Sequence, residues 1–185
     1  MKILEKTHLV DFPFSWADTE NYRNSDANRT EIYLPDNDNS VEGLIKLFYN
    51  LFNNVQSDLL VYNNSWWDFC LDTWNIKADE YNYDLQNRSE ESRAYVELLI
   101  GAEIEVGYSG CCKCNDWNKF LPVVLSCITS HAAPYSPRFC DVENEFFFYF
   151  HHTGSIGLYF KRENNVIKRI LEIAAREYVV DPYAD

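Results

Sequence analysis

The fold class is decided by one stretch, EFFFYFHHTGSIGLYFK, which runs from Glu145 to Lys161. Its first part, Glu145–Phe150, is dominated by aromatic residues, which favour strands. Thr153–Gly157 follows with two glycines, a residue common in turns. Ile156–Lys161 then returns as a second apolar strand. The sequence therefore predicts a β-hairpin over residues 145–161, in which the two strands are antiparallel neighbours.

The rest of the chain mixes helices with short strands. In each expected helix, apolar residues recur at spacings of three and four, which indicates one buried face. A side chain that accepts a backbone N–H is expected to cap the first and the last of them. The expected helices are 41–52 with a cap at Asn39 or Ser40, 89–99 beginning at Ser89, a segment that starts late because of Pro122, and a C-terminal helix capped by Asn164 or Asn165.

Three further segments have the short, apolar or alternating pattern of strands. They are Glu31–Leu34, which interrupts an expected polar loop over 15–39, Asp58–Tyr62, and Glu103–Tyr108. Because the hairpin is the one strand pair that the sequence defines, an α+β fold is favoured over a doubly wound parallel sheet. We expect a single compact domain over residues 1–185, with a mostly antiparallel sheet and about four helices.

The overall composition limits the classes of function. The chain has 185 residues, 46% of them hydrophobic, so it can build its own core. Its formal net charge is −13, with most of the acidic excess in residues 1–105. A field this negative repels nucleic acid and anionic membranes and attracts basic proteins. The sequence contains neither a signal-peptide pattern nor a membrane-spanning stretch, so we expect a cytoplasmic protein with reduced cysteines.

One cluster has the spacing of a zinc site. Between Cys111 and His131 the chain reads C-x₂-C-x₁₂-C-x₃-H, with Cys114 and Cys127 as the other two members. The alternative is that Cys111–Cys114 ends a strand or forms a turn while Cys127 and His131 belong to a buried helix. Because buried cysteine is a common core residue, we favour reduced, structural thiols and expect no metal or other cofactor.

His151 and His152 are candidates for a general base, since histidine titrates near neutral pH. Neighbouring residues of a strand point to opposite faces, so only one of the pair can face a given site. No nucleophile motif accompanies either residue. We therefore assign no catalytic residue and keep a small hydrolase that uses His151 or His152 as an alternative function.

The segment Ser65–Asp84 combines tryptophan and tyrosine with carboxylates. Aromatic side chains anchor protein interfaces, and carboxylates around them pair with Arg and Lys of a partner. A solvated acidic surface beside a core anchored by tryptophan is the simpler alternative. The residues that we expect to bind a partner are Trp66, Asp68, Asp72, Asp79, Glu80, Tyr81 and Asp84.

In size, acidity and lack of a catalytic motif, the whole chain resembles bacterial toxin-immunity proteins of the contact-dependent growth inhibition type. The resemblance implies an antitoxin that is monomeric alone and forms a heterodimer with a basic cognate toxin domain, such as a nuclease. It also implies that the inhibitor covers the active-site or substrate-binding surface of the toxin. Two other functions remain open: a DNA mimic that inhibits a restriction or CRISPR enzyme, and an adaptor stabilised by zinc.

Overall fold

The predicted hairpin lies near the middle of the sheet. The structure is a computed structural model that describes residues 2–18 and 26–182. β8 (Phe146–His151) and β9 (Ser155–Phe160) pair antiparallel along their whole length. At the tip, Gly154 has a φ of +87°, and a Cβ there would clash with the backbone oxygen of Asp38. Both observations explain why this turn uses glycine.

The described residues form one eight-stranded sheet and one two-stranded sheet. Every strand pair in both sheets is antiparallel, which confirms the predicted α+β class. The order of the large sheet is β1-β6-β3-β7-β8-β9-β2-β10. Its other strands are β1 (Leu4–Lys6), β2 (Asn28–Tyr33), β3 (Leu60–Asn63), β6 (Gly110–Cys114), β7 (Arg138–Asp141) and β10 (Val179–Pro182).

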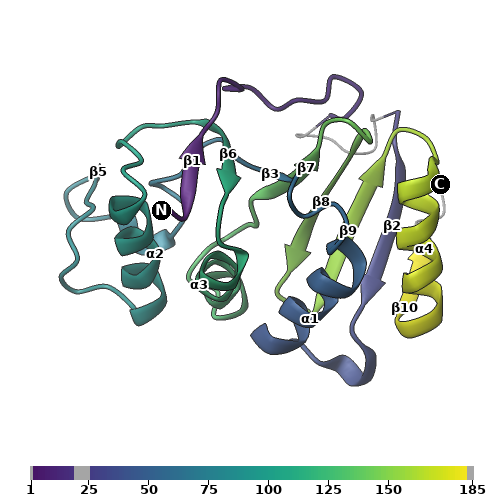
Figure 1. Ribbon diagram of the computed structural model, residues 1–185. Coiled ribbons are helices and arrows are strands. Elements are labelled where there is room, and N and C mark those ends of the chain that lie inside the picture. Colours follow the sequence, from purple (N-terminus) through teal and green to yellow (C-terminus); the bar gives the residue numbers. More distant parts are fainter. Residues whose placement is uncertain (1, 19–25, 183–185) are drawn as a thin grey trace.

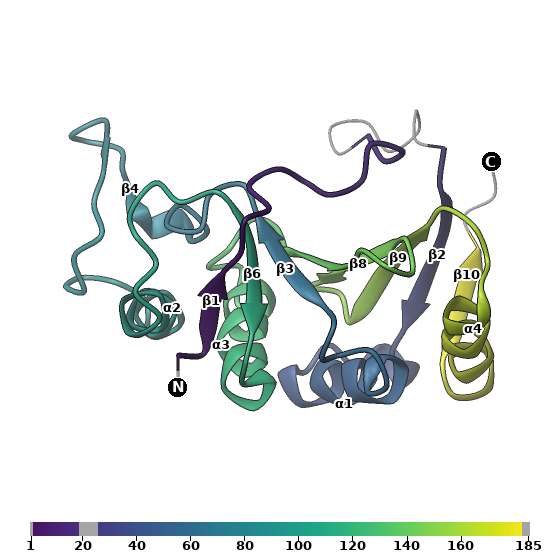
Figure 2. The same cartoon turned by 45° about the horizontal axis from the view of Figure 1, so that its top comes forward.

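Within the described residues there are four α-helices: α1 (Val41–Phe52), α2 (Glu90–Gly101), α3 (Trp117–Thr129) and α4 (Asn165–Glu177). Figures 1 and 2 show α1, α3 and α4 on one face of the large sheet, and α2 packs beside α3. Side chains of Ser40 and Asn164 cap α1 and α4. In the part of the chain that is described, no helix has both the length and the apolar character needed to span a bilayer.

The main core lies between the sheet and these helices. Alternate residues of β8 point to the helices, and Phe148 stacks on Phe52 of α1 with ring centroids 3.9 Å apart. The other β8 residues point to the opposite face. There Phe147 packs against Phe12 and Phe14 of the N-terminal segment, which crosses that face of the sheet (Figure 2). The sheet is therefore covered on both sides over much of its area.

Two sequence predictions are corrected. α3 begins at Trp117, five residues before Pro122, although we expected a helix that starts late. The proline removes one backbone hydrogen bond, but this helix buries an apolar face that includes Phe120 and Leu121, which offsets that loss. Asp116 caps the helix by accepting from the backbone N–H of Lys119.

The second correction concerns Glu103–Tyr108, which is not a strand. α2 ends at Gly101, and Glu103 follows with a φ of +57°. The segment is a loop in which Ile104 is buried and Val106 is exposed, so alternation arose without strand pairing. The predicted strands 31–34 and 58–62 are confirmed as β2 and β3 with small shifts in their ends. Residues 19–25 of the expected loop lie outside the described residues.

Candidate functional site

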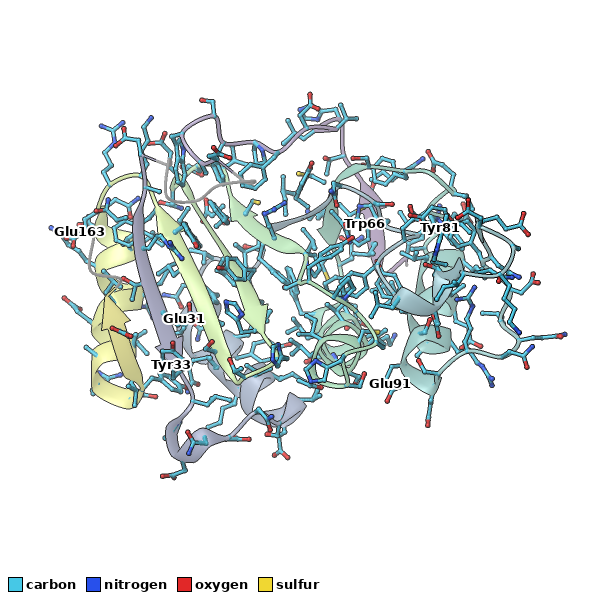
Figure 3. All side chains as sticks on the ribbon, turned by 180° about the vertical axis from the view of Figure 1, so that it is seen from behind. Glu31, Tyr33, Trp66, Tyr81, Glu91 and Glu163 are labelled. Carbon is cyan, nitrogen blue, oxygen red and sulfur yellow. The ribbon has the colours of Figure 1, made fainter. Side chains whose placement is uncertain are left out.

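The predicted acidic–aromatic segment divides into a buried base and an exposed part. Trp66 belongs to the base and is fully buried. Its Nε1 donates a hydrogen bond to the carbonyl oxygen of Gly110 at 3.0 Å, and its own carbonyl accepts from the hydroxyl of Tyr95 at 2.9 Å. This burial corrects the expectation that Trp66 contacts a partner, because its ring is part of the core (Figure 3).

Asp68 is half-buried and holds the base together. Its carboxylate accepts hydrogen bonds from Ser65 Oγ and from the hydroxyl of Tyr83, the latter at 2.5 Å. Burial raises the pKa of Tyr83, and the hydrogen bond to Asp68 raises it further. Tyr83 therefore stays protonated and remains a donor. Asp68 is a structural acceptor in the first place, and its charge is only partly available to a partner.

Asp72 closes the segment against α2. Its carboxylate accepts from Arg88 Nη1 at 3.1 Å and from Ser92 Oγ at 2.5 Å. The backbone N–H of Ser89, which caps α2, also donates to it. The side chain of Arg88 is only 3% exposed, so this ion pair is partly shielded from water. Replacing Asp72 would loosen the fold as well as change the surface.

The other part, which we call the projecting segment, comprises Leu71–Asp84 and is mostly exposed, although Thr73 is buried and Tyr83 packs on the base. It holds a 3₁₀ turn, η3 (Leu71–Thr73), and a small sheet made of β4 (Trp74–Asn75) and β5 (Glu80–Tyr81). Figures 1 and 2 show it at the end of the molecule beyond α2, away from α4. It is separate from the large sheet, so its side chains are free of the main strand ladder.

The remaining predicted residues lie on the projecting segment. Asp79, Glu80, Tyr81 and Asp84 are all exposed. Tyr81 is 50% exposed and contacts the ring of Trp74, its partner across the small sheet, at a centroid distance of 4.9 Å. Four carboxylates and one lysine lie within residues 71–84. The segment therefore presents aromatic surface within a negative field.

Sequence reasoning missed Ile76 as a member of this surface. Its side chain is 85% exposed in the turn between β4 and β5, and Leu71 and Trp74 are 58% and 40% exposed. Exposed single apolar residues are ordinary, but four exposed apolar or aromatic side chains within residues 71–81 are typical of an interaction surface. Ile76 lies between the polar residues Asn75 and Lys77, and this placement was the signal that it is exposed. An argument from strand faces alone does not assign it to the surface.

The cysteine cluster is not assembled into one site. Cys111 faces the N-terminal segment, while Cys114 faces the helices from the same strand. Cys127 lies with its Sγ 3.8 Å from Sγ of Cys70, and His131 lies in a turn after α3. Across residues 2–18 and 26–182, no group of three or more His, Cys, Asp or Glu side chains is arranged to hold a metal ion.

A second feature is a pocket of about 630 Å³ at one end of the sheet, which we call the histidine pocket. It is lined from the ends of β3, β7 and β8, from the loop 131–137, and by Ile128 of α3 and Leu71. His131, His151 and His152 all line it, and the rings of His131 and His152 are 4.6 Å apart. The two histidines that the sequence singled out thus meet a third from another element.

Behind the pocket, His151 Nε2 lies 3.6 Å from the carboxylate of Glu31 on β2. Glu31 is 2% exposed and also accepts a hydrogen bond from Ser155 Oγ. Ser155 is fully buried, and its hydroxyl donates to the carboxylate rather than to the imidazole. Figure 3 shows Glu31 on the sheet face that lies opposite the helices. The arrangement orients the ring of His151.

Comparisons with known proteins identify no relative of this chain. No protein-family model matches the chain, and no similar protein was found among curated proteins or solved structures.

Proposed function

We propose that the chain is a cytoplasmic immunity protein that binds and neutralises a basic toxin domain through the projecting segment. The single observation that carries this proposal is the projecting segment itself, where Trp74, Ile76 and Tyr81 are exposed among carboxylates. Apolar and aromatic side chains supply contact area, and the carboxylates complement Arg and Lys of the partner. In a toxin nuclease, the surface that normally binds nucleic-acid phosphates is the one that carries these Arg and Lys side chains.

The long-range charge supports the same proposal. With a net charge of −13, the molecule attracts a basic domain from beyond contact distance, which speeds association at low salt. Once the two proteins are in contact, the exposed side chains of Trp74, Ile76 and Tyr81 determine the rate of dissociation. We therefore expect changes of the carboxylates to alter mainly the rate of association, and changes of the apolar residues to alter mainly the rate of dissociation.

The test uses the basic protein domain encoded in the gene adjacent to this one. We expect its expression to arrest growth and co-expression of this chain to restore growth. The purified proteins should form a one-to-one complex whose association rate falls as salt rises. If the adjacent gene encodes no basic domain, or if the purified pair does not bind, the proposed function is wrong.

Matched variants locate the surface. Combined Asp79→Lys and Glu80→Lys should slow association by about tenfold or more and weaken its salt dependence. The control is combined Glu163→Lys and Glu172→Lys, an equal change of charge at exposed positions; Figure 3 places Glu163 at the opposite end from Tyr81. Equal effects of the two double variants would mean that only net charge matters, and the projecting segment would not be the binding surface.

A further inference from the structure

The histidine pocket has an electrostatic character opposite to that of the whole chain. The chain carries 29 acidic residues against 16 Lys and Arg, yet no Asp or Glu is among the lining residues of this pocket. Three of the four histidines line it, and so does Arg138. Two carboxylates lie close by and partly offset this character: Glu31 behind His151, and Asp68, which acts on Tyr135 of the lining. In an acidic protein, such a set of cationic and donor groups favours an anionic ligand.

A buried amide points to the same kind of ligand. Asn63, at the end of β3, lines the pocket and is 2% exposed. Its Oδ1 accepts from the backbone N–H of Ser65 at 3.0 Å and from the hydroxyl of Tyr135 at 3.3 Å. These two bonds fix the orientation of the amide. Its Nδ2 is buried and has no hydrogen-bond partner in the described part of the chain, so a donor is left over at the pocket.

The histidines His131 and His152 are a second source of hydrogen-bond donors in the pocket, besides Asn63. His131 is held in the left-handed backbone region, with a φ of +61°, at the turn that follows α3. This conformation is unfavourable for a residue with a side chain, and here it leaves the imidazole 4.6 Å from that of His152. Each imidazole carries at least one N–H donor, so two rings this close can both donate to one anionic group.

Asn64 and Ser136 add polar groups to the lining, and the rest of the walls are largely apolar or aromatic. Ile128, Phe150 and Tyr149 line the pocket beside Tyr135, whose pKa burial raises to about 12. Tyr135 is therefore protonated at neutral pH and can donate or accept through its hydroxyl. A volume of about 630 Å³ is within the range of small-molecule sites. An inorganic ion alone would leave these walls without contacts, so the ligand needs an apolar body.

We infer that the histidine pocket binds a small organic anion, in which a carboxylate or phosphate group is attached to a ring. The anionic group accepts from Arg138, Asn63 and the paired histidines, and the ring packs on the aromatic wall. Leu71 is the one residue of the projecting segment that lines this pocket, whereas Trp74, Ile76 and Tyr81, which carry the proposed partner contact, do not line it. A failure of either proposal therefore leaves the other standing.

The test uses four probes that separate charge from ring. Benzoate and phenyl phosphate carry both, benzamide carries the ring alone, and inorganic phosphate carries the charge alone. Imidazole resonances of all four histidines are followed by NMR, with each probe raised to about 10 mM, which saturates a site with a Kd of about 1 mM. We expect the two ring-bearing anions to shift His131, His151 and His152 but not His8, which is outside the pocket. The stronger of the two then identifies the anionic group.

Variants test the assigned groups. His152→Gln and Arg138→Gln should each weaken binding of the better anion by about tenfold or more, since each removes a charge-assisted hydrogen bond. Asn63→Asp should abolish binding, because it replaces the free donor with a carboxylate. His8→Gln is the matched control and should bind like the parent chain. Circular dichroism checks that each variant is folded, because Arg138 also packs over the rings of Phe12 and Tyr62.

Three results would overturn the inference. One is the absence of any shift with all of the anions. Another is equal binding of benzamide and benzoate, which would show that charge is not recognised. The third is unchanged affinity in folded His152→Gln and Arg138→Gln chains, since the anion would then lie elsewhere.

Discussion

At the scale of single residues, two tryptophans of neighbouring sequence have different environments. Trp66 is fully buried with a hydrogen-bonded indole, whereas Trp74 is 40% exposed on the projecting segment. We expect Trp66→Ala to lower the free energy of unfolding by about 3–5 kcal/mol. Trp74→Ala should lower it by less than about 1 kcal/mol, the scale of one aromatic contact. Urea unfolding followed by circular dichroism measures both values.

The same pair tests the proposed function. Trp74→Ala should shorten the lifetime of the complex with the basic partner while leaving the fold intact. A Trp66→Ala chain that keeps the stability of the parent would contradict the burial described above. A Trp74→Ala chain with unchanged dissociation would remove Trp74 from the interface.

Local sequence could not separate these two residues. Both lie among Asp and polar side chains, and a tryptophan between carboxylates is typical of a surface. The burial of Trp66 depends on Gly110 and Tyr95, which are 44 and 29 positions away along the chain. No pattern within the segment contains that information. Tyr81, in contrast, is half exposed, as its polar neighbours in the sequence indicate.

Three cysteines of β6 predict how stability changes with pH. Burial raises the pKa of Cys111 to about 11 and those of Cys112 and Cys114 to about 12. The folded state therefore favours the protonated thiols. Their contribution to stability is complete below about pH 9, the range of the unfolded chain, and is lost as the pH rises from about 9 to 12.

Under reducing conditions, we expect the urea midpoint to fall between pH 8 and pH 10.5. Each thiol contributes about 1.4 kcal/mol for each unit of its shift that the pH crosses. Cys112→Ala should make the fall shallower, even though its stability at pH 8 is lower. An equally steep fall in Cys112→Ala would assign the effect to other groups, such as the buried tyrosines.

At the scale of elements, the cap of α4 separates two asparagines that the sequence left equivalent. Asn164 accepts from the backbone N–H of Ile167 at 2.9 Å and donates to the carbonyl of Asn144 at 3.0 Å. We expect Asn164→Ala to cost about 1–2 kcal/mol of stability. Asn165→Ala, at the exposed first position of the helix, is the control and should be close to neutral. Thermal unfolding of the two variants decides between them.

Elements with strong periodicity were the ones that sequence predicted well. The hairpin 145–161 was found because aromatic and apolar strands flank a turn with glycine, and the helix 41–52 because it has helical spacing and a cap beside it. α3 was placed too late because Pro122 is a helix breaker in isolation. Its first turn is retained by burial of Trp117 and Phe120 against other elements, an energy that local propensity does not include.

At the scale of the whole molecule, the projecting segment is an appendage to the large sheet. Replacing Ile76–Asp79 with Asn-Gly, a pair suited to a two-residue turn, should leave the thermal midpoint within a few degrees of the parent. The same change should reduce affinity for the basic partner by at least about tenfold. The control is an Ala substitution of exposed Glu172 on α4. A large loss of stability would show that the segment supports the core.

The histidine pocket belongs to this scale as well. His131 and the pair His151–His152 come from different elements, and they meet because β7 and β8 return the chain past the end of α3. The sequence indicated each histidine separately, one as a zinc ligand and two as candidate bases. Only the topology assigns them to one place. The net charge of the chain also gave no sign of this pocket, because it sums all charged residues whereas no Asp or Glu lines the pocket.

The order of strands also governs how the chain can be made. β2 pairs with β9 and β10, whose residues 155–160 and 179–182 are translated long after residues 28–33. A ribosome must therefore pass residue 160 before β2 can pair with β9, and residue 182 before β2 can pair with β10. During that interval the unpaired strand and the aromatic N-terminal segment are open to chaperones and to aggregation. Such distant pairing also slows the search for the native state, so the β2 edge of the sheet is expected to form late in folding.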